Sequence, residues 1–96
     1  MQLEIITPEH KVFEGEAVAA QFPGKDGLFQ VLDNHAAIIS VLKQGEVKID
    51  LANSFKKTEE SNEQIAVDAK NDKVIRFALK GGVVEVSDNK VIVLAD

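Results

Sequence analysis

The hydrophobic residues of this chain occur in short runs rich in Val, Ile and Phe, each bounded by Gly, Pro, Asn or Asp. Almost no stretch keeps the 3.6-residue period of an amphipathic helix, so the pattern predicts an all-β fold. Ten strands are expected, at residues 3–7, 11–14, 16–22, 28–32, 36–42, 46–51, 64–69, 73–79, 83–86 and 91–94. One flat sheet would leave a hydrophobic face exposed, which favours a β-sandwich; a flattened barrel meets the same requirement.

Turn-forming residues separate the runs: Thr7-Pro8-Glu9, Pro23-Gly24-Lys25-Asp26-Gly27, Leu32-Asp33-Asn34, Gln44-Gly45, Gly81-Gly82 and Asp88-Asn89. In the last of these, Asp and Asn tolerate the left-handed backbone of a tight hairpin. Residues 53–63 are poor in apolar side chains and dense in charge, and we expect an exposed loop or hairpin tip there. A short helix is the alternative, since Lys57, Glu60 and Gln64 fall at helical spacing.

Two of the expected strands are apolar on both faces, at residues 38–42 and 91–94. A strand with one face in water alternates apolar and polar side chains, so these two strands need cover on both sides. A loop, a bent strand or another protein would provide that cover. Alternatively, both are central strands of a closed, barrel-like core.

Length and charge limit the possible functions. The chain has 96 residues, enough for one hydrophobic core, so a single domain is expected over residues 1–96. The net charge is −5, and no run of Lys or Arg forms a basic stripe. Nucleic-acid binding is therefore not expected.

The sequence also indicates a cellular location. It has no Cys, and its first residues have neither a basic segment nor a long apolar segment of the kind that directs secretion, which favours the cytoplasm. The longest uncharged apolar run, residues 36–42, is roughly a third of the length of a membrane span. Direct insertion into lipid is not expected.

Few residues of the chain suggest catalysis. The two histidines, His10 and His35, have no second histidine at ligand spacing and no cysteine beside them, so no metal site is expected. Asp33 and His35 resemble part of a nucleophilic triad, but no serine lies in a G-x-S-x-G motif. Residues 23–27 lack the order of a phosphate-binding loop. The sequence predicts no catalytic, metal-binding or cofactor-binding residue.

The turns and strands, taken in order, resemble the epsilon subunit of F-type ATP synthases. The resemblance covers nearly the whole chain. It is carried by Leu3-Glu4-Ile5-Ile6-Thr7-Pro8-Glu9, Phe13-Glu14-Gly15-Glu16, Pro23-Gly24-Lys25-Asp26-Gly27, Asn34-His35-Ala36, Leu42-Lys43-Gln44-Gly45 and the block from Gly81-Gly82-Val83 to Leu94-Ala95-Asp96.

The resemblance implies a fold and two partners. In that family the N-terminal domain is a sandwich of two five-stranded sheets, which matches a ten-stranded chain. One face of the domain lies on the gamma subunit, and one end lies on the polar loops of the membrane c-ring. Carried over by position, the residues expected at gamma are Thr7, His35 and Ser40. Those expected at the c-ring are Lys25, Asp26, Gly27 and Leu28.

The chain departs from the family pattern in several places, among them a region, residues 51–76, that is longer than in many members. Many members have Pro-Gly-His-Ala-Pro where this chain has Asp33-Asn34-His35-Ala36-Ala37, so the turn is less rigid. An acidic residue common in the c-ring loop is replaced by Leu28, and Asp26 is the expected source of negative charge. Many members continue into two helices that regulate ATP hydrolysis, whereas this sequence stops at Asp96, so we expect no C-terminal helical domain.

The resulting expectation is a non-catalytic rotor subunit in the central stalk of a proton-translocating ATP synthase, peripheral to the cytoplasmic face of the bacterial inner membrane. It would connect gamma to the c-ring and need no cofactor. A β-sandwich adaptor for another protein is the first alternative. The second is a small hydrolase or sugar-binding protein that uses Asp33 and His35.

Overall fold

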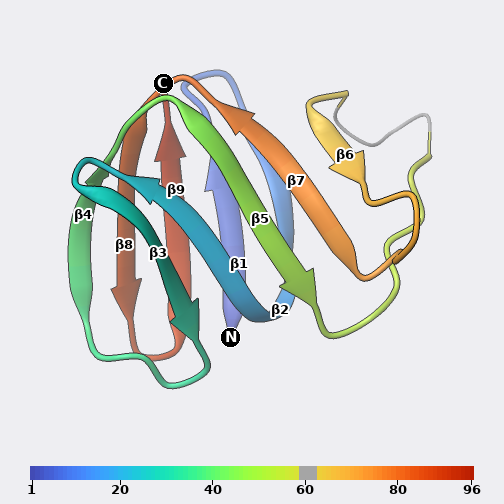
Figure 1. Ribbon diagram of the computed structural model, residues 1–96, viewed down its shortest axis with the longest axis horizontal. Helices are drawn as coiled ribbons and strands as arrows, with labels where there is room; N and C mark the ends of the chain where they lie inside the picture. Colours follow the sequence, from blue (N-terminus) through green and yellow to red (C-terminus); the bar gives the residue numbers. More distant parts are fainter. Residues whose placement is uncertain (59–62) are drawn as a thin grey trace.

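The computed structural model describes residues 1–58 and 63–96, and these residues form nine β-strands (Figure 1). The strands are β1 (Gln2–Ile6), β2 (Lys11–Gly24), β3 (Gly27–Leu32), β4 (Ile38–Leu42), β5 (Gly45–Leu51), β6 (Ile65–Val67), β7 (Val74–Leu79), β8 (Gly82–Ser87) and β9 (Lys90–Ala95). The described residues contain no helix. The predicted all-β class is therefore confirmed.

The strands form two packed layers that share β2. The first half of β2 pairs with β1, which continues through β9 and β8 to β4. The second half pairs with β3 on one side and β5 on the other, and β5 continues through β7 to β6. Each layer thus has five strand positions, as a sandwich of two five-stranded sheets requires, although the number of strands is nine.

The expected strands at 11–14 and 16–22 are one strand, and this is the main correction to the sequence prediction. Gly15 does not interrupt β2, because it pairs with Leu3 in the ladder. A side chain at Gly15 would begin 2.8 Å from Cζ of Phe13, so the Phe13 ring covers the position that the glycine leaves open. Gly15 therefore makes room for the Phe13 ring within a continuous strand and does not end the strand.

β2 has two irregularities, one near its start and one where it crosses between the layers. The register with β1 shifts between Ile5 and Ile6, and the register with β5 shifts between Ala17 and Ala19. The second shift leaves Val18 without a partner on β5, with 47% of its surface exposed. Such bulges increase strand twist, which lets one 14-residue strand bend from one sheet into the other.

The core lies between the layers and is made of side chains that alternate inward. Its largest completely buried side chains are Phe22, Phe77, Leu3, Ile5, Ile49, Ile65 and Ile75. Phe55 joins this core from the charge-dense segment, with its ring centroid 6.0 Å from that of Phe13. Residues 53–58 and 63 have no regular structure, as expected for a loop. Glu59 and Glu60 lie outside the described residues.

Two element boundaries also differ from the prediction. β2 runs through Pro23 and Gly24, so only Lys25 and Asp26 form the tip of the β2–β3 hairpin. β4 begins at Ile38 and not at residue 36, because the chain enters it through an exposed connection over residues 33–37. The turn at Asp88 and Asn89 has positive φ values of 52° and 58°, as its residue types indicated.

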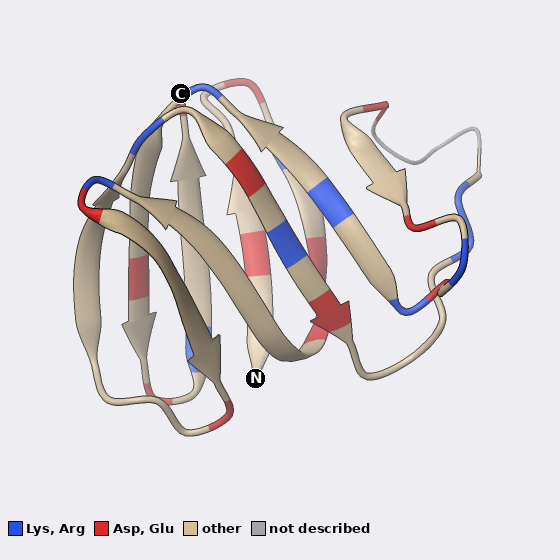
Figure 2. Ribbon diagram, viewed as in Figure 1, with Lys and Arg blue, Asp and Glu red and all other residues tan. Residues whose placement is uncertain are grey.

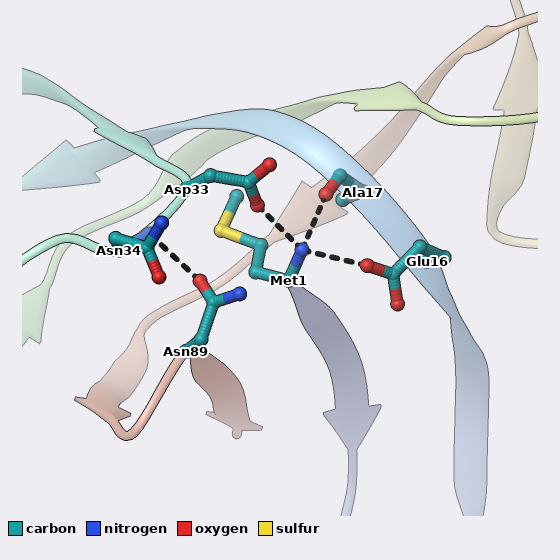
Figure 3. A network of polar contacts seen from close by, with 6 residues as sticks. All are labelled: Met1, Glu16, Ala17, Asp33, Asn34 and Asn89. Carbon is teal, nitrogen blue, oxygen red and sulfur yellow. Dashed lines mark hydrogen bonds and ion pairs between the residues drawn. The ribbon is translucent and has the colours of Figure 1, made fainter.

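The α-amino group of Met1 ties β1 to neighbouring segments (Figure 3). It donates to Oε1 of Glu16 at 2.8 Å, to the carbonyl of Ala17 at 2.8 Å and to Oδ1 of Asp33 at 2.6 Å. Burial disfavours the charged amine, but the hydrogen bonds to Asp33 and Glu16 outweigh it and raise the pKa above the ordinary 8.0. The ammonium group therefore stabilises the start of the connection that leads to His35.

This contact predicts a loss of stability with rising pH. Below pH 8.0 the ammonium form is present in both the folded and the unfolded chain, and the stabilisation is complete. Above it the unfolded chain loses its proton first, so the free energy of unfolding falls until the folded amine also deprotonates. Urea unfolding between pH 7 and 9.5 measures how steeply the free energy of unfolding falls with pH. This slope should be shallower in Asp33→Asn. Equal slopes in the two proteins would contradict the contact.

Gly82, at the start of β8, provides a test of the backbone geometry. Its φ is +152°, and an added Cβ would lie 2.2 Å from the carbonyl oxygen of Leu94. We expect Gly82→Ala to destabilise the fold by about 2–4 kcal/mol. Gly27→Ala is the control, because Gly27 also has a positive φ, +131°, but an added Cβ meets nothing within 4 Å. That variant should lose only about 1 kcal/mol in chemical denaturation.

Candidate interaction surface

The outer face of the layer containing β8 is apolar over four strands. Cross-strand pairing aligns Val41 of β4 with Val83 of β8, Val83 with Leu94 of β9, and Leu94 with Ile6 of β1. A second row aligns Ile39 with Glu85, and Glu85 with Ile92. We call this surface the β8 face, and its members are Ile6, Ile39, Val41, Val83, Glu85, Ile92 and Leu94.

Several side chains of the β8 face are open to solvent. Ile39 is 74% exposed, Val41 56% and Leu94 50%. The residues between them on the same strands, such as Val84 and Val93, are completely buried in the core. The doubly apolar strands predicted at 38–42 and 91–94 are therefore covered on one side only. Contiguous exposed apolar surface of this kind marks interaction sites.

The outer face of the other layer is charged along β5 and β7. Figure 2 shows acidic and basic bands alternating along β5, where Glu46, Lys48 and Asp50 point away from the core. Arg76 of β7 pairs with Asp68 at 2.7 Å and with Glu46 at 3.4 Å. The hydrogen bond from Arg76 is the main cause of the lowered pKa of Asp68. Along β5 and β7 the layer thus has the polar outer face expected of a sheet in water, whereas β3 exposes Leu28 and Leu32.

A charged cluster borders the β8 face on the side of β1 and β2. The side chain of Glu4, a residue only 7% exposed, lies 2.7 Å from Nζ of Lys11 and 3.4 Å from Nζ of Lys90. Lys11 also lies 3.5 Å from Glu14. The hydrogen bond from Lys11 lowers the pKa of Glu4, so its carboxylate stays ionised. Apart from Glu85, the surface is thus apolar, with a charged rim on the side of β1 and β2, as in protein interfaces.

The three residues expected at gamma do not cluster in one place. Thr7 follows β1, and its side chain donates to the His10 carbonyl at 3.1 Å. His35 is exposed in the connection before β4, with Nδ1 2.7 Å from the Ala36 carbonyl. Ser40 lies on β4 opposite the buried Val84, on the side of the strand away from Ile39.

These positions lie at different ends of the sandwich (Figure 1). Asn34, next to His35, donates to Asn89 just before β9 begins. Thr7 instead lines a depression with Asp96, just after β9 ends. Thr7 and His35 are therefore separated by the length of β9, and Ser40 lies between the two ends.

The four residues expected at the c-ring are contiguous at one end. Lys25 and Asp26 are exposed at the tip of the β2–β3 hairpin, and Leu28 is 68% exposed. The amide of Lys25 donates to the carbonyl of Val41 at 3.2 Å, which fixes the hairpin beside the end of β4. Gly27 provides the positive φ that the turn needs. The hairpin tip thus lies beside one border of the β8 face.

Asp33 and His35 are engaged separately. The carboxylate of Asp33 accepts from the Met1 amine, whereas the His35 ring contacts the adjacent Ala36 carbonyl. No cluster of His, Asp and Glu suited to a metal ion occurs among the described residues. Within the same residues, no helix has the length and hydropathy to cross a membrane.

Sequence reasoning found part of this surface. It singled out Ile39, Val41, Ile92 and Leu94 as members of doubly apolar strands but did not identify Glu85 or its neighbour Val83. The available signal was the alternation along residues 83–86, which places Val83 and Glu85 on one side of the strand. Their alignment with β4 and β9 depends on register, which the sequence does not display.

Comparison with known proteins agrees with the β-sandwich. Residues 1–67 match the family described as ATP synthase, Delta/Epsilon chain, beta-sandwich domain. The ATP synthase epsilon chain of Chlorobium limicola is 36% identical over 95 residues, which cover 99% of this chain and 88% of the relative. The ATP synthase epsilon chain of Chlorobaculum tepidum is 35% identical over 94 residues, which cover 98% of this chain and 86% of that relative. The epsilon chain of Salinibacter ruber is 36% identical, but this chain spans only 58% of it.

A solved structure shares the fold. A chain in the cryo-EM structure of the Tetrahymena thermophila mitochondrial ATP synthase central stalk and c-ring aligns with a TM-score of 0.71 at 19% identity. The alignment covers 99% of this chain and 62% of that chain. The family match spans more than half of the sequence, and the identity to the Chlorobium limicola protein extends over nearly all of it. The chain therefore belongs to the ATP synthase delta/epsilon family and contains its β-sandwich domain.

Proposed function

We propose that this chain is a non-catalytic rotor subunit in the central stalk of an F-type ATP synthase, which connects the gamma subunit to the membrane c-ring and supports the coupling of proton flow to ATP synthesis. The exposed apolar β8 face is the observation that carries this proposal. Its relatives are named ATP synthase epsilon chains, and its structural neighbour comes from a central stalk and c-ring. The expected location is peripheral, on the cytoplasmic face of the bacterial inner membrane.

The β8 face is the proposed contact with gamma. Its apolar rows cross four hydrogen-bonded strands, so the surface is broad and resists shear, as a joint that transmits torque must. Burying Ile39, Val41 and Leu94 would remove the largest exposed apolar area of this layer from water. Thr7 and His35 would contribute at the two ends of the contact, and Ser40 at the edge of β4.

The β2–β3 hairpin tip is the proposed contact with the c-ring. Lys25, Asp26, Gly27 and Leu28 protrude at one end of the sandwich and are not part of the β8 face. The tip touches the face only at the end of β4, so a partner at the tip would leave the rows on β8, β9 and β1 available to a second partner. Leu28 offers an exposed apolar side chain, and Asp26 offers a carboxylate two positions away.

Ile39→Asp tests the contact with gamma. Ile39 is 74% exposed, so the variant should fold normally. A carboxylate in the middle of an apolar interface loses its hydration, and we expect the affinity for purified gamma to fall at least roughly 30-fold, or about 2 kcal/mol. Isothermal titration calorimetry measures this change. Leu32→Asp is the control, because Leu32 is 53% exposed on β3, outside the β8 face.

Equal affinity of the two variants for gamma would contradict the assignment of the β8 face. Failure of the unaltered chain to bind a gamma subunit from the same source would contradict the stalk function. In that case the β8 face would belong to an adaptor with another protein partner.

Asp26→Lys tests the contact with the c-ring. The variant reverses the charge at the hairpin tip, so we expect it to lose most of the extra affinity that a gamma and c-ring subassembly shows over gamma alone. Its affinity for gamma should stay within about twofold, because Asp26 lies outside the β8 face and exposed charges contribute little to binding. Calorimetry against both partners separates the effects. Unchanged binding to the subassembly would remove Asp26 from the contact.

A further inference from the structure

We propose that the carboxylate of Glu85 binds a cationic side chain of the partner, and that this pair fixes the orientation of the partner on the β8 face. The inference rests on the proposed function, because it takes the gamma subunit as the partner. It adds a specific chemical requirement: the gamma surface has an arginine or a lysine within its apolar contact area.

Glu85 lies between two apolar side chains in the second row of the β8 face. It occupies β8, between Ile39 of β4 on one side and Ile92 of β9 on the other. Its neighbours on the same face of β8 are Val83, which pairs with Val41, and Ser87, which pairs with Lys90. Glu85 itself is exposed in the isolated chain. A partner that covers Ile39 and Ile92 must therefore cover this carboxylate as well.

No group of the chain neutralises Glu85. Among the described residues, none makes a hydrogen bond or an ion pair with its carboxylate. The nearby lysine on β9, Lys90, points to Glu4, with Nζ 3.4 Å from Oε2. Lys11 is likewise shared between Glu4 and Glu14. Lys11 and Lys90 thus pair with carboxylates of β1 and β2, and neither lysine forms an ion pair with Glu85.

Covering an unpaired carboxylate with apolar side chains is unfavourable, because the protein interior does not replace the lost hydration. The partner therefore needs a cation opposite Glu85. An arginine matches best, because its planar guanidinium binds a carboxylate through two hydrogen bonds while its faces pack on apolar side chains such as Ile39 and Ile92. Such a pair would also reject a partner displaced by one strand, which would place an apolar group over Glu85.

A different role for Glu85 makes the opposite prediction. A charge within an exposed apolar sheet face also hinders association between copies of the same chain. If Glu85 has only that role, it opposes every partner, and an apolar residue in its place improves binding to gamma.

Glu85→Gln and Glu85→Leu distinguish these roles. If Glu85 pairs with a cation, both variants leave that cation covered and unpaired, and the dissociation constant for purified gamma should rise roughly 30-fold or more. Glu46→Gln is the matched control, since Glu46 is an exposed glutamate of β5 on the other layer, and its affinity should stay within about twofold. Increasing salt should weaken the binding of gamma to the unaltered chain more than its binding to Glu85→Gln.

Each result has a separate meaning. Tighter binding of gamma by Glu85→Leu, or equal affinity of Glu85→Gln and the unaltered chain, would overturn the proposed pair while leaving the β8 face as the gamma contact. Weaker binding by both variants, recovered when Glu85→Lys is combined with an Arg→Glu or Lys→Glu change in gamma, would support it. No binding by the unaltered chain would instead overturn the proposed function.

Discussion

The architecture depends on the participation of β2 in both layers. Its first half holds β1 in place, and its second half holds β3 and β5. Because β1 pairs with β9, and β9 continues through β8 to β4, the position of the whole apolar layer follows from this one strand. The bulge at Val18 and the covered Gly15 are the local features that let the strand bend. The bend fixes one sheet relative to the other without support from long loops.

The two outer faces solve different problems. The face that contains β5 and β7 alternates buried and charged residues, and Arg76 satisfies two carboxylates there. The β8 face places Ile39, Val41 and Leu94 in water, where they add nothing to the core and favour association. The continuous hydrogen bonding of β4, β8, β9 and β1 makes this surface rigid. Little conformational entropy is therefore lost when a partner binds. The same strands therefore place buried core side chains on one side and exposed apolar side chains on the other.

The sequence was sufficient to predict the fold class and most of the strands. It also predicted that the apolar residues of 38–42 and 91–94 need cover from other parts of the chain or from a partner. It misplaced the boundaries where backbone conformation depends on tertiary contacts. Gly15 was predicted to separate two strands, because its packing beneath the Phe13 ring is not visible in the sequence. The residues of the β8 face come from four strands distant in the chain, and only their register aligns Glu85 with Ile39 and Ile92. For the same reason, positional analogy named Thr7 and His35 together, although the length of β9 separates them.

Methyl NMR of the isotopically labelled chain, titrated with unlabelled gamma subunit, tests the central claim most directly. The chain is small, 10.5 kDa, and its exposed apolar residues are distributed over both layers. The account predicts that the methyl signals of Ile39, Val41 and Leu94 shift or broaden, while those of Val18 and Leu32 stay unchanged. Perturbation of Val18 and Leu32 with unchanged signals from the β8 face would contradict it.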